Sequence, residues 1–262
     1  MLLKLDHKFI AVYLVITNLS VLIHAETLRI AVASNFLETA KILSEHFEQQ
    51  TKHSVQISSG SSGKLYLQIT KGAPFDLFLS ADTQKPLELI RNNLALSDSR
   101  RTYARGKLAL WIKNCESSFA LTDLNNDSFH KIAVANPNLA PYGVASQQLL
   151  EKHHLWQDLY TKLIRTENIS QVAQLAKLGV VDAAFIAQSN ADHLQTNNSN
   201  CLITLHESDY LPIEQQLIIV SNSKNLRLAK EFANFLQSEK AHNLIKNRGY
   251  SAPYSVKIQP QK

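Results

Sequence analysis

Residues 54–82 constrain the fold of this chain more than any other segment. An apolar strand over 54–57 is followed by a run of serines and glycines over 58–63 and by a helical stretch over 65–71. A Gly72-Ala73-Pro74 turn and a second apolar strand over 75–79 come next. This order predicts a strand–helix–strand unit with parallel strands and a right-handed crossover.

The serine and glycine run places unpaired backbone N–H groups at the start of a helix. Such a helix start also carries the positive end of the helix dipole, so it attracts an anion. The run lacks the lysine of a P-loop and the glycine spacing of a dinucleotide-binding fingerprint. The segment therefore favours a small anion over a nucleotide.

The first 25 residues are typical of a secretory signal. Lys4 and Lys8 precede an apolar stretch over 9–23, and Ala25 is a small residue at the predicted cleavage position. The stretch is short for a membrane span, although an uncleaved anchor stays an alternative. No cysteine lies near the predicted cleavage position, which argues against a lipid anchor. We expect export into a periplasm and a mature chain of 237 residues (262 minus 25), enough for two lobes.

Charge and metal-ligand patterns exclude several functions. The net charge is +5, but lysines and arginines are mixed with acidic residues and form no basic stripe, which argues against nucleic acid. Ten histidines show no convincing ligand spacing, and the adjacent His153 and His154 point to different sides of a predicted helix. Cys115 and Cys201 could pair in an oxidising compartment, and the sequence leaves this open.

The strand–helix alternation continues along the whole chain. Strands are predicted over 27–33, 108–112, 132–135, 163–165, 182–187 and 217–220, and helices over 142–150, 156–164, 168–178 and 226–246, the last broken near Ser238. Asn35 is expected to cap the first helix, with Glu38 as its capping-box partner. The strands over 108–112 and 217–220 are expected to cross between lobes. These features predict an α/β protein of two lobes with mostly parallel sheets, lobe 1 over 26–107 and 221–262 and lobe 2 over 108–220.

Seven short stretches resemble the periplasmic molybdate-binding proteins of ABC importers. They are VASN over 32–35, SSGKL over 61–65, GAPFDLFLSAD over 72–82, ANP over 135–137, PYG over 141–143, DAAFI over 182–186 and RGY over 248–250. The resemblance implies the two-lobe periplasmic-binding-protein fold, type II-like, with a cleft between the lobes. It also implies a monomer that delivers molybdate, and tungstate, to a membrane permease with a cytoplasmic ATPase, without catalysis and without a cofactor.

The resemblance also implies the ligand contacts. They are Ser34 and Asn35 from the first strand–helix turn, Ser62 with Ser61 beside it from the second, and the backbone N–H groups of Tyr142 and Ile169 from lobe 2. Some relatives carry a tyrosine where this chain has Ala187, and its hydroxyl reaches the ligand. The Tyr142 hydroxyl is the candidate to replace that donor, which the sequence leaves open.

The residue types agree with a fully deprotonated dianion. None of the six contacts is a carboxylate, so a proton on the ligand would find no acceptor, and none is a lysine or arginine. Neutral dipoles at helix starts can offset two charges without burying a cation. A binder of another oxyanion, such as sulfate, is the main alternative. A secreted hydrolase is weaker, because no nucleophile has an identifiable base.

Overall fold

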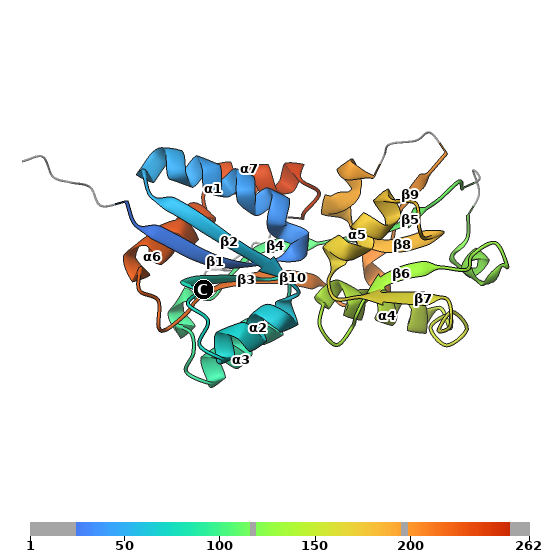
Figure 1. The fold of residues 1–262 in the computed structure, drawn as a ribbon, viewed down its shortest axis with the longest axis horizontal. Coiled ribbons are helices and arrows are strands. Elements are labelled where there is room, and N and C mark those ends of the chain that lie inside the picture. Colours follow the sequence, from blue (N-terminus) through green and yellow to red (C-terminus); the bar gives the residue numbers. More distant parts are fainter. Residues whose placement is uncertain (1–24, 116–118, 195–198, 252–262) are drawn as a thin grey trace, which may run out of the picture.

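The chain folds into two lobes that lie side by side along the long axis of the molecule (Figure 1). The computed structural model describes residues 25–115, 119–194 and 199–251. The predicted signal segment over 1–25 thus lies outside the described residues except for Ala25. The expected two-lobed α/β architecture is confirmed, since each lobe has a five-stranded sheet flanked by helices. Both sheets are mixed and not mostly parallel as expected, because two of the four strand pairings in each are antiparallel.

The first sheet has the strand order β2-β1-β3-β10-β4. Strands β1 (Thr27–Ala33), β2 (Ser54–Gly60) and β3 (Leu77–Ser80) are parallel, and β10 (Ile213–Ile219) runs antiparallel between β3 and β4 (Arg101–Gly106). The lobe's helices are α1 (Leu37–Thr51), α2 (Ser62–Thr70), α3 (Gln84–Arg91), α6 (Leu226–Phe235) and α7 (Glu239–Asn247). The strand–helix–strand unit predicted over 54–82 is therefore present as β2, α2 and β3.

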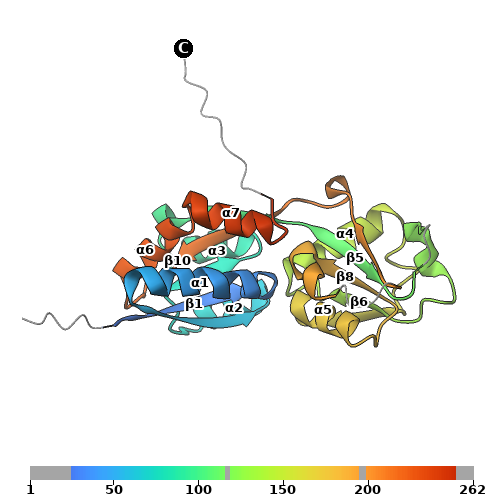
Figure 2. The ribbon, with the colours of Figure 1, turned by 90° about the horizontal axis from the view of Figure 1, so that it is seen from above.

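The two faces of this sheet are covered by different helices because its side chains alternate. Leu28, Ile30 and Val32 of β1 pack with α1, α6 and α7, whereas Ala31 packs with α2 and α3 on the opposite face. Figure 2 shows α1 and α7 together over one side of the first lobe. Alternating burial on both faces explains why β1 is a nearly continuous apolar run.

The second sheet has the order β7-β6-β8-β5-β9. Its strands are β5 (Leu108–Ile112), β6 (Ile132–Ala135), β7 (Leu163–Thr166), β8 (Ala183–Ala187) and β9 (Cys201–Thr204). Helices α4 (Pro141–Lys152) and α5 (Ile169–Lys177) connect β6 with β7 and β7 with β8, the parallel part of the sheet. Strand β5 runs antiparallel to both of its neighbours.

One predicted boundary is wrong. Strand β10 belongs to the first sheet, so residues 213–219 are not the end of lobe 2, and the chain returns from the second sheet between β9 and β10. The expected crossing strands are thus ordinary sheet strands, and the crossings are the short segments at 107 and at 205–212. An apolar run shows that a strand is buried but does not show which sheet buries it.

The helix predicted over 156–164 is also wrong. Residues 156–162 form consecutive turns, and β7 begins at Leu163. Trp156 and Leu159 are buried in the core of the second lobe, so tertiary packing holds this short segment in place together with turn hydrogen bonds and one bond of α-helical spacing, from the Leu159 N–H to the Leu155 carbonyl. A segment of this length gains too few helical hydrogen bonds to offset the cost of nucleation.

The predicted break in the C-terminal helix is confirmed. Helix α6 ends at Phe235 and α7 begins at Glu239. The Ser238 hydroxyl accepts a hydrogen bond from the Ala241 N–H at 3.2 Å, which caps α7.

Cys115 and Cys201 form a disulfide bond, which the sequence left open. Their Cα atoms lie 5.7 Å apart, and the bond joins the segment after β5 to the first residue of β9. It closes a loop across 86 positions of the chain. The bond thereby ties the edge strand β9 to its only neighbour in the sheet, β5.

Replacing both cysteines by serine should lower the free energy of unfolding by about 2–4 kcal/mol, because the unfolded chain regains the freedom that the cross-link removes. The measurement is urea unfolding of the double variant beside the parent protein, each with and without a reductant. The reductant should destabilise only the parent. Equal stability of parent and double variant without reductant would contradict a formed bond.

Candidate functional site

The predicted contacts lie at the starts of four helices, two from each lobe. Ser34 and Asn35 are in the short 3-10 turn that precedes α1, and Ser61 and Ser62 begin α2. Tyr142 and Ile169 occupy the second and first positions of α4 and α5. All six residues are buried, with at most 6% of any of them exposed.

Hydrogen bonds between the lobes hold these helix starts against each other. The Ser170 hydroxyl, beside Ile169, donates to the Ser34 carbonyl at 2.9 Å, and the Ser189 hydroxyl donates to the Asn35 carbonyl at 3.3 Å. The structure thus brings Ser34 and Asn35 of the first lobe together with the α5 start of the second.

A second contact between the lobes depends on a glycine. The Gly63 N–H donates to the Leu139 carbonyl at 2.9 Å, next to Ser62 and three residues before Tyr142. A Cβ atom on Gly63 would lie 2.9 Å from that carbonyl oxygen, so this approach of the two loops requires glycine. At the exposed rim, Lys64 and Glu167 form an ion pair at 2.9 Å.

The hydroxyl of Ser62 is arranged as a donor. Its oxygen accepts a hydrogen bond from the Ala81 N–H at 2.9 Å, which leaves the hydroxyl hydrogen for another acceptor. The neighbouring Ser61 caps α2, since its oxygen accepts from the Lys64 N–H at 3.3 Å. The two serines predicted together therefore have different local partners.

Asn35 does not cap α1, contrary to the expectation from sequence. The residue before α1 is Phe36, without a side-chain cap, and Glu38 pairs with Lys41 instead. Asn35 lies within the 3-10 turn that precedes the helix, and its side chain is buried. Its Nδ2 donates to Gln215 Oε1 at 3.0 Å and to the Tyr250 hydroxyl at 3.3 Å.

The N–H groups of Tyr142 and Ile169 are unpaired donors. Their positions at helix starts give them no acceptor within the helix, and no acceptor is found elsewhere in the part of the chain that the structure describes. Asn168 pairs instead with the next two N–H groups, those of Ser170 and Gln171. Two buried donors from lobe 2 thus remain available to an anion.

The Tyr142 side chain reaches from the second lobe to the first. Its hydroxyl accepts a hydrogen bond from Gln215 Nε2 at 3.3 Å. Burial, and then the neighbouring Tyr250 and Tyr210, raise the pKa of Tyr142 well above its usual value, so the phenol keeps its proton at neutral pH. Ala187, where some relatives have a tyrosine, is fully buried at the end of β8 and provides no polar group.

Asp82 is a carboxylate that directly follows Ala81, whose N–H bonds to Ser62. Its Oδ1 accepts a hydrogen bond from the Lys85 N–H at 2.8 Å, which satisfies the first turn of α3. Burial raises the pKa of Asp82 above its usual value. The carboxylate therefore accepts from the first turn of α3, although Thr83 and not Asp82 directly precedes the helix.

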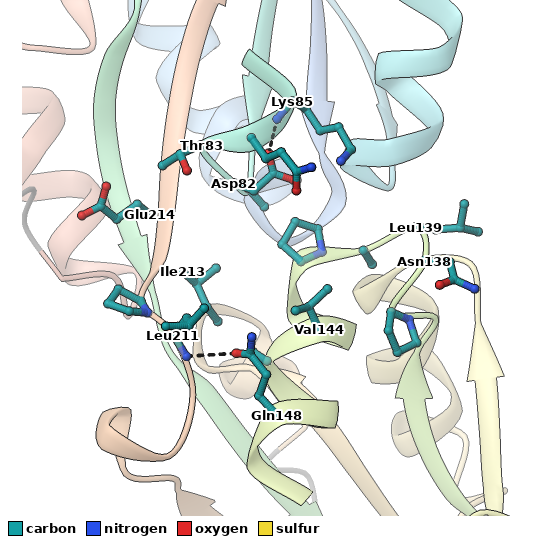
Figure 3. Close-up of a pocket in the computed structure, with 17 residues that line it drawn as sticks. Asp82, Thr83, Lys85, Asn138, Leu139, Val144, Gln148, Leu211, Ile213 and Glu214 are labelled. Atoms are coloured by element: carbon teal, nitrogen blue, oxygen red, sulfur yellow. Dashed lines mark hydrogen bonds between the residues drawn. The ribbon is translucent and has the colours of Figure 1, made fainter. Parts of the chain in front are cut away.

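An open groove lies beside the buried contacts. It has a volume of about 200 Å³ and is bounded by the residues before and within the start of α3, by the loop that leads into α4, and by the segment that leads into β10 (Figure 3). Val144, Leu211 and Ile213 make part of it apolar. None of the six predicted contacts lines this groove, so it is separate from the buried site.

Sequence reasoning missed Gln215, Tyr103 and Tyr250. All three are buried and hydrogen-bonded around Asn35 or Gln215. Two adjacent glutamines inside the apolar strand β10 were the signal for Gln215, and Tyr250 ends the RGY stretch over 248–250, to which the sequence gave no role. Among the described residues, no group of three or more potential metal-ligating side chains is found, and none of the described helices is long and apolar enough to cross a membrane.

Residues 28–251 match the family model of bacterial extracellular solute-binding proteins. This chain belongs to that family. It is 33% identical to the molybdate-binding protein ModA of Rhodobacter capsulatus over 84% of this chain and 86% of the relative, and 34% identical to ModA of Azotobacter vinelandii over 86% and 90%.

Solved structures agree with this assignment. The periplasmic molybdate-binding protein of Azotobacter vinelandii superposes with a TM-score of 0.81 at 34% identity, covering 86% of this chain and 99% of that one. The sulfate-binding protein SubI of Mycobacterium tuberculosis has a TM-score of 0.71 over 88% of each chain, but at 13% identity it shows the fold alone. The expected two-lobe periplasmic-binding-protein fold is confirmed.

Replacing Gly106 by alanine should lower the free energy of unfolding by about 1–3 kcal/mol, the usual cost of overpacking. The added Cβ would lie 2.1 Å from the Tyr142 hydroxyl and 2.8 Å from Gln215 Nε2. Gly60→Ala is the matched control, because its Cβ would meet only Leu65, at 3.7 Å. Urea unfolding measures both, and equal stability would show that Tyr142 does not lie against Gly106 in the unliganded protein.

Proposed function

We propose that this protein is the periplasmic substrate-binding component of a molybdate ABC importer, and that it also binds tungstate. The observation that supports the proposal is that the six predicted contacts are buried at four helix starts, and that hydrogen bonds from Ser170 to Ser34 and from Gly63 to Leu139 join helix starts of the two lobes. Relatives that are 33% and 34% identical over most of the chain are molybdate-binding proteins, which supports the same ligand here.

The donor set suits a tetrahedral dianion without a proton. Molybdate at neutral pH accepts hydrogen bonds through all four oxygens and offers none. The Ser62 hydroxyl and the N–H groups of Tyr142 and Ile169 supply donors, and four helix dipoles supply positive potential. Hydrogen bonds to a charged acceptor are about twice as strong as those between neutral groups.

Capture and delivery follow from the two lobes. A ligand that contacts both lobes stabilises the closed arrangement by its differential affinity for the closed and open states. The loaded protein then presents a different surface from the empty one to a membrane permease with its cytoplasmic ATPase. In this proposal the protein is exported to the periplasm by residues 1–25, acts as a monomer, needs no cofactor and performs no catalysis.

Molybdate and tungstate should bind at least about tenfold more tightly than phosphate, because the proton on hydrogen phosphate finds no acceptor in the site. An unpaired buried polar group costs about 1–3 kcal/mol, and a tenfold difference in affinity requires only about 1.4 kcal/mol. Calorimetric titration of the mature protein with molybdate, tungstate, sulfate and phosphate is the test. Equal or tighter binding of phosphate would contradict a site made of donors only. Tighter binding of sulfate than of molybdate would indicate that the protein serves a sulfate importer instead.

Ser62→Ala should weaken molybdate binding by about 1.5–3 kcal/mol, the usual contribution of a hydrogen bond to a charged group. Ser59→Ala, an exposed serine in the same run, is the control and should bind as the parent does. Calorimetry on both variants measures the effect. Unchanged affinity of Ser62→Ala for molybdate would show that this hydroxyl does not contact the ligand.

Adding molybdate should compact the protein and raise its melting temperature. Ligand at a hundredfold excess over the dissociation constant stabilises the folded state by about 2.7 kcal/mol. Solution X-ray scattering measures the radius of gyration, and calorimetry measures the melting temperature. Stabilisation without compaction would indicate a site that does not close the lobes.

A further inference from the structure

Gln215 links the two lobes at the buried site, although it is not one of the predicted contacts. It is fully buried on β10, next to an irregularity in the pairing of β10 with β4. Its Oε1 accepts from Asn35 and lies 3.1 Å from the Tyr103 hydroxyl, and its Nε2 donates to the Tyr142 hydroxyl. Its amide therefore touches Asn35 of the first lobe and Tyr142 of the second.

The direction of these hydrogen bonds is fixed by a backbone carbonyl. The Tyr250 hydroxyl donates its single hydrogen to the Asn35 carbonyl at 2.7 Å, because a carbonyl can only accept. The Tyr250 oxygen can then only accept from the Asn35 side chain 3.3 Å away, so the Asn35 amide presents Nδ2 rather than its oxygen.

The orientation of Asn35 determines that of Gln215. Since Asn35 Nδ2 is a donor, the Gln215 atom 3.0 Å away must be the acceptor Oε1. The Tyr103 hydroxyl lies 3.1 Å from the same oxygen and 3.2 Å from the Ser80 carbonyl, so its single hydrogen is shared between two acceptors and the assignment of Gln215 follows from Asn35. Gln215 therefore presents Nε2 to Tyr142, and the reversed amide would bring two donors together at Asn35.

The orientation of Gln215 determines what the Tyr142 hydroxyl can do. Because the raised pKa keeps the phenol protonated, the hydroxyl has one hydrogen and receives one from Gln215. The incoming N–H occupies one side of the oxygen, so the hydrogen of Tyr142 has to point away from Gln215. No acceptor for that hydrogen is found among the described residues, so the hydroxyl can donate it to a bound ligand.

We propose that Gln215 is a positioning residue that holds the Tyr142 hydroxyl as a donor and so makes the site reject oxyanions that carry a proton. This inference rests on the proposed function. A hydroxyl can accept as well as donate, so the Tyr142 hydroxyl could reverse its role if Gln215 did not hold it. With Gln215 in place, the hydroxyl group of a protonated oxyanion meets another donor there.

A comparison of selenate with hydrogen arsenate tests whether the site rejects an oxyanion because of its proton and not because of its size or charge. Both are tetrahedral dianions of similar size, and only hydrogen arsenate carries a proton at mildly alkaline pH. Each is titrated in competition with molybdate by calorimetry. The parent should prefer selenate to hydrogen arsenate by at least about tenfold.

In Gln215→Met the preference for selenate should fall to about threefold or less, because the Tyr142 hydroxyl loses the Gln215 donor that directs its hydrogen. In a Tyr142→Phe background, adding Gln215→Met should leave the selenate to arsenate ratio unchanged. Gln216→Met is the matched control, since Gln216 is nearly as buried but bonds to Thr102, and its ratio should equal that of the parent.

The inference is overturned if Gln215→Met has the same selenate to arsenate ratio as the parent. It is also overturned if Gln215→Met changes this ratio by the same factor in the Tyr142→Phe background. Neither result contradicts the proposed function, provided that the parent binds molybdate. Absence of molybdate binding by the parent would overturn the proposed function and this inference with it. If Gln215→Met does not fold, Gln215→Asn serves in its place. Its amide is one methylene too short to span from Asn35 to Tyr142, so its ratio should fall in the same way.

Discussion

The buried N–H groups at the helix starts are the constraint on which the rest of the structure depends. A buried donor without an acceptor costs about 1–3 kcal/mol, and the N–H groups of Tyr142 and Ile169 have no acceptor among the described residues. Closing the lobes over such donors is therefore unfavourable unless an anion lies between them. The same feature that attracts the ligand also makes closure depend on the ligand.

The path of the chain places that site where both lobes can act on it. Strand β10 returns to the first sheet before the C-terminal helices form, so a residue beside the crossing can contact both lobes. Gln215 occupies this position and bonds to Asn35 and Tyr142. Gly106, at the end of the neighbouring strand β4, leaves the space that the Tyr142 hydroxyl needs. The strands beside the crossing between the lobes therefore pack directly against the site, so a change in one of them also alters the other.

Much of the architecture was predictable because local signals agreed with each other. Strand β6 matches its predicted range, α5 begins within one residue of the predicted start at Asn168, and the break at Ser238 is present as expected. Errors arose where tertiary contacts outweighed local preference. Residues 156–162 form turns held by buried Trp156 and Leu159, and Asn35 turns away from α1 to bond with Gln215.

The sequence by itself determined the strand–helix alternation, the serine-rich helix start and the absence of charge among the predicted contacts, because each depends on residues that are neighbours in the chain. Only the tertiary structure decided that β10 joins the first sheet, that Cys115 pairs with Cys201, and that Gln215 lies between Asn35 and Tyr142. These depend on residues 73 to 180 positions apart, whose proximity is set by packing. The tertiary structure also decides which groups donate and which accept at the site, because the hydrogen-bond partners there are far apart in the sequence.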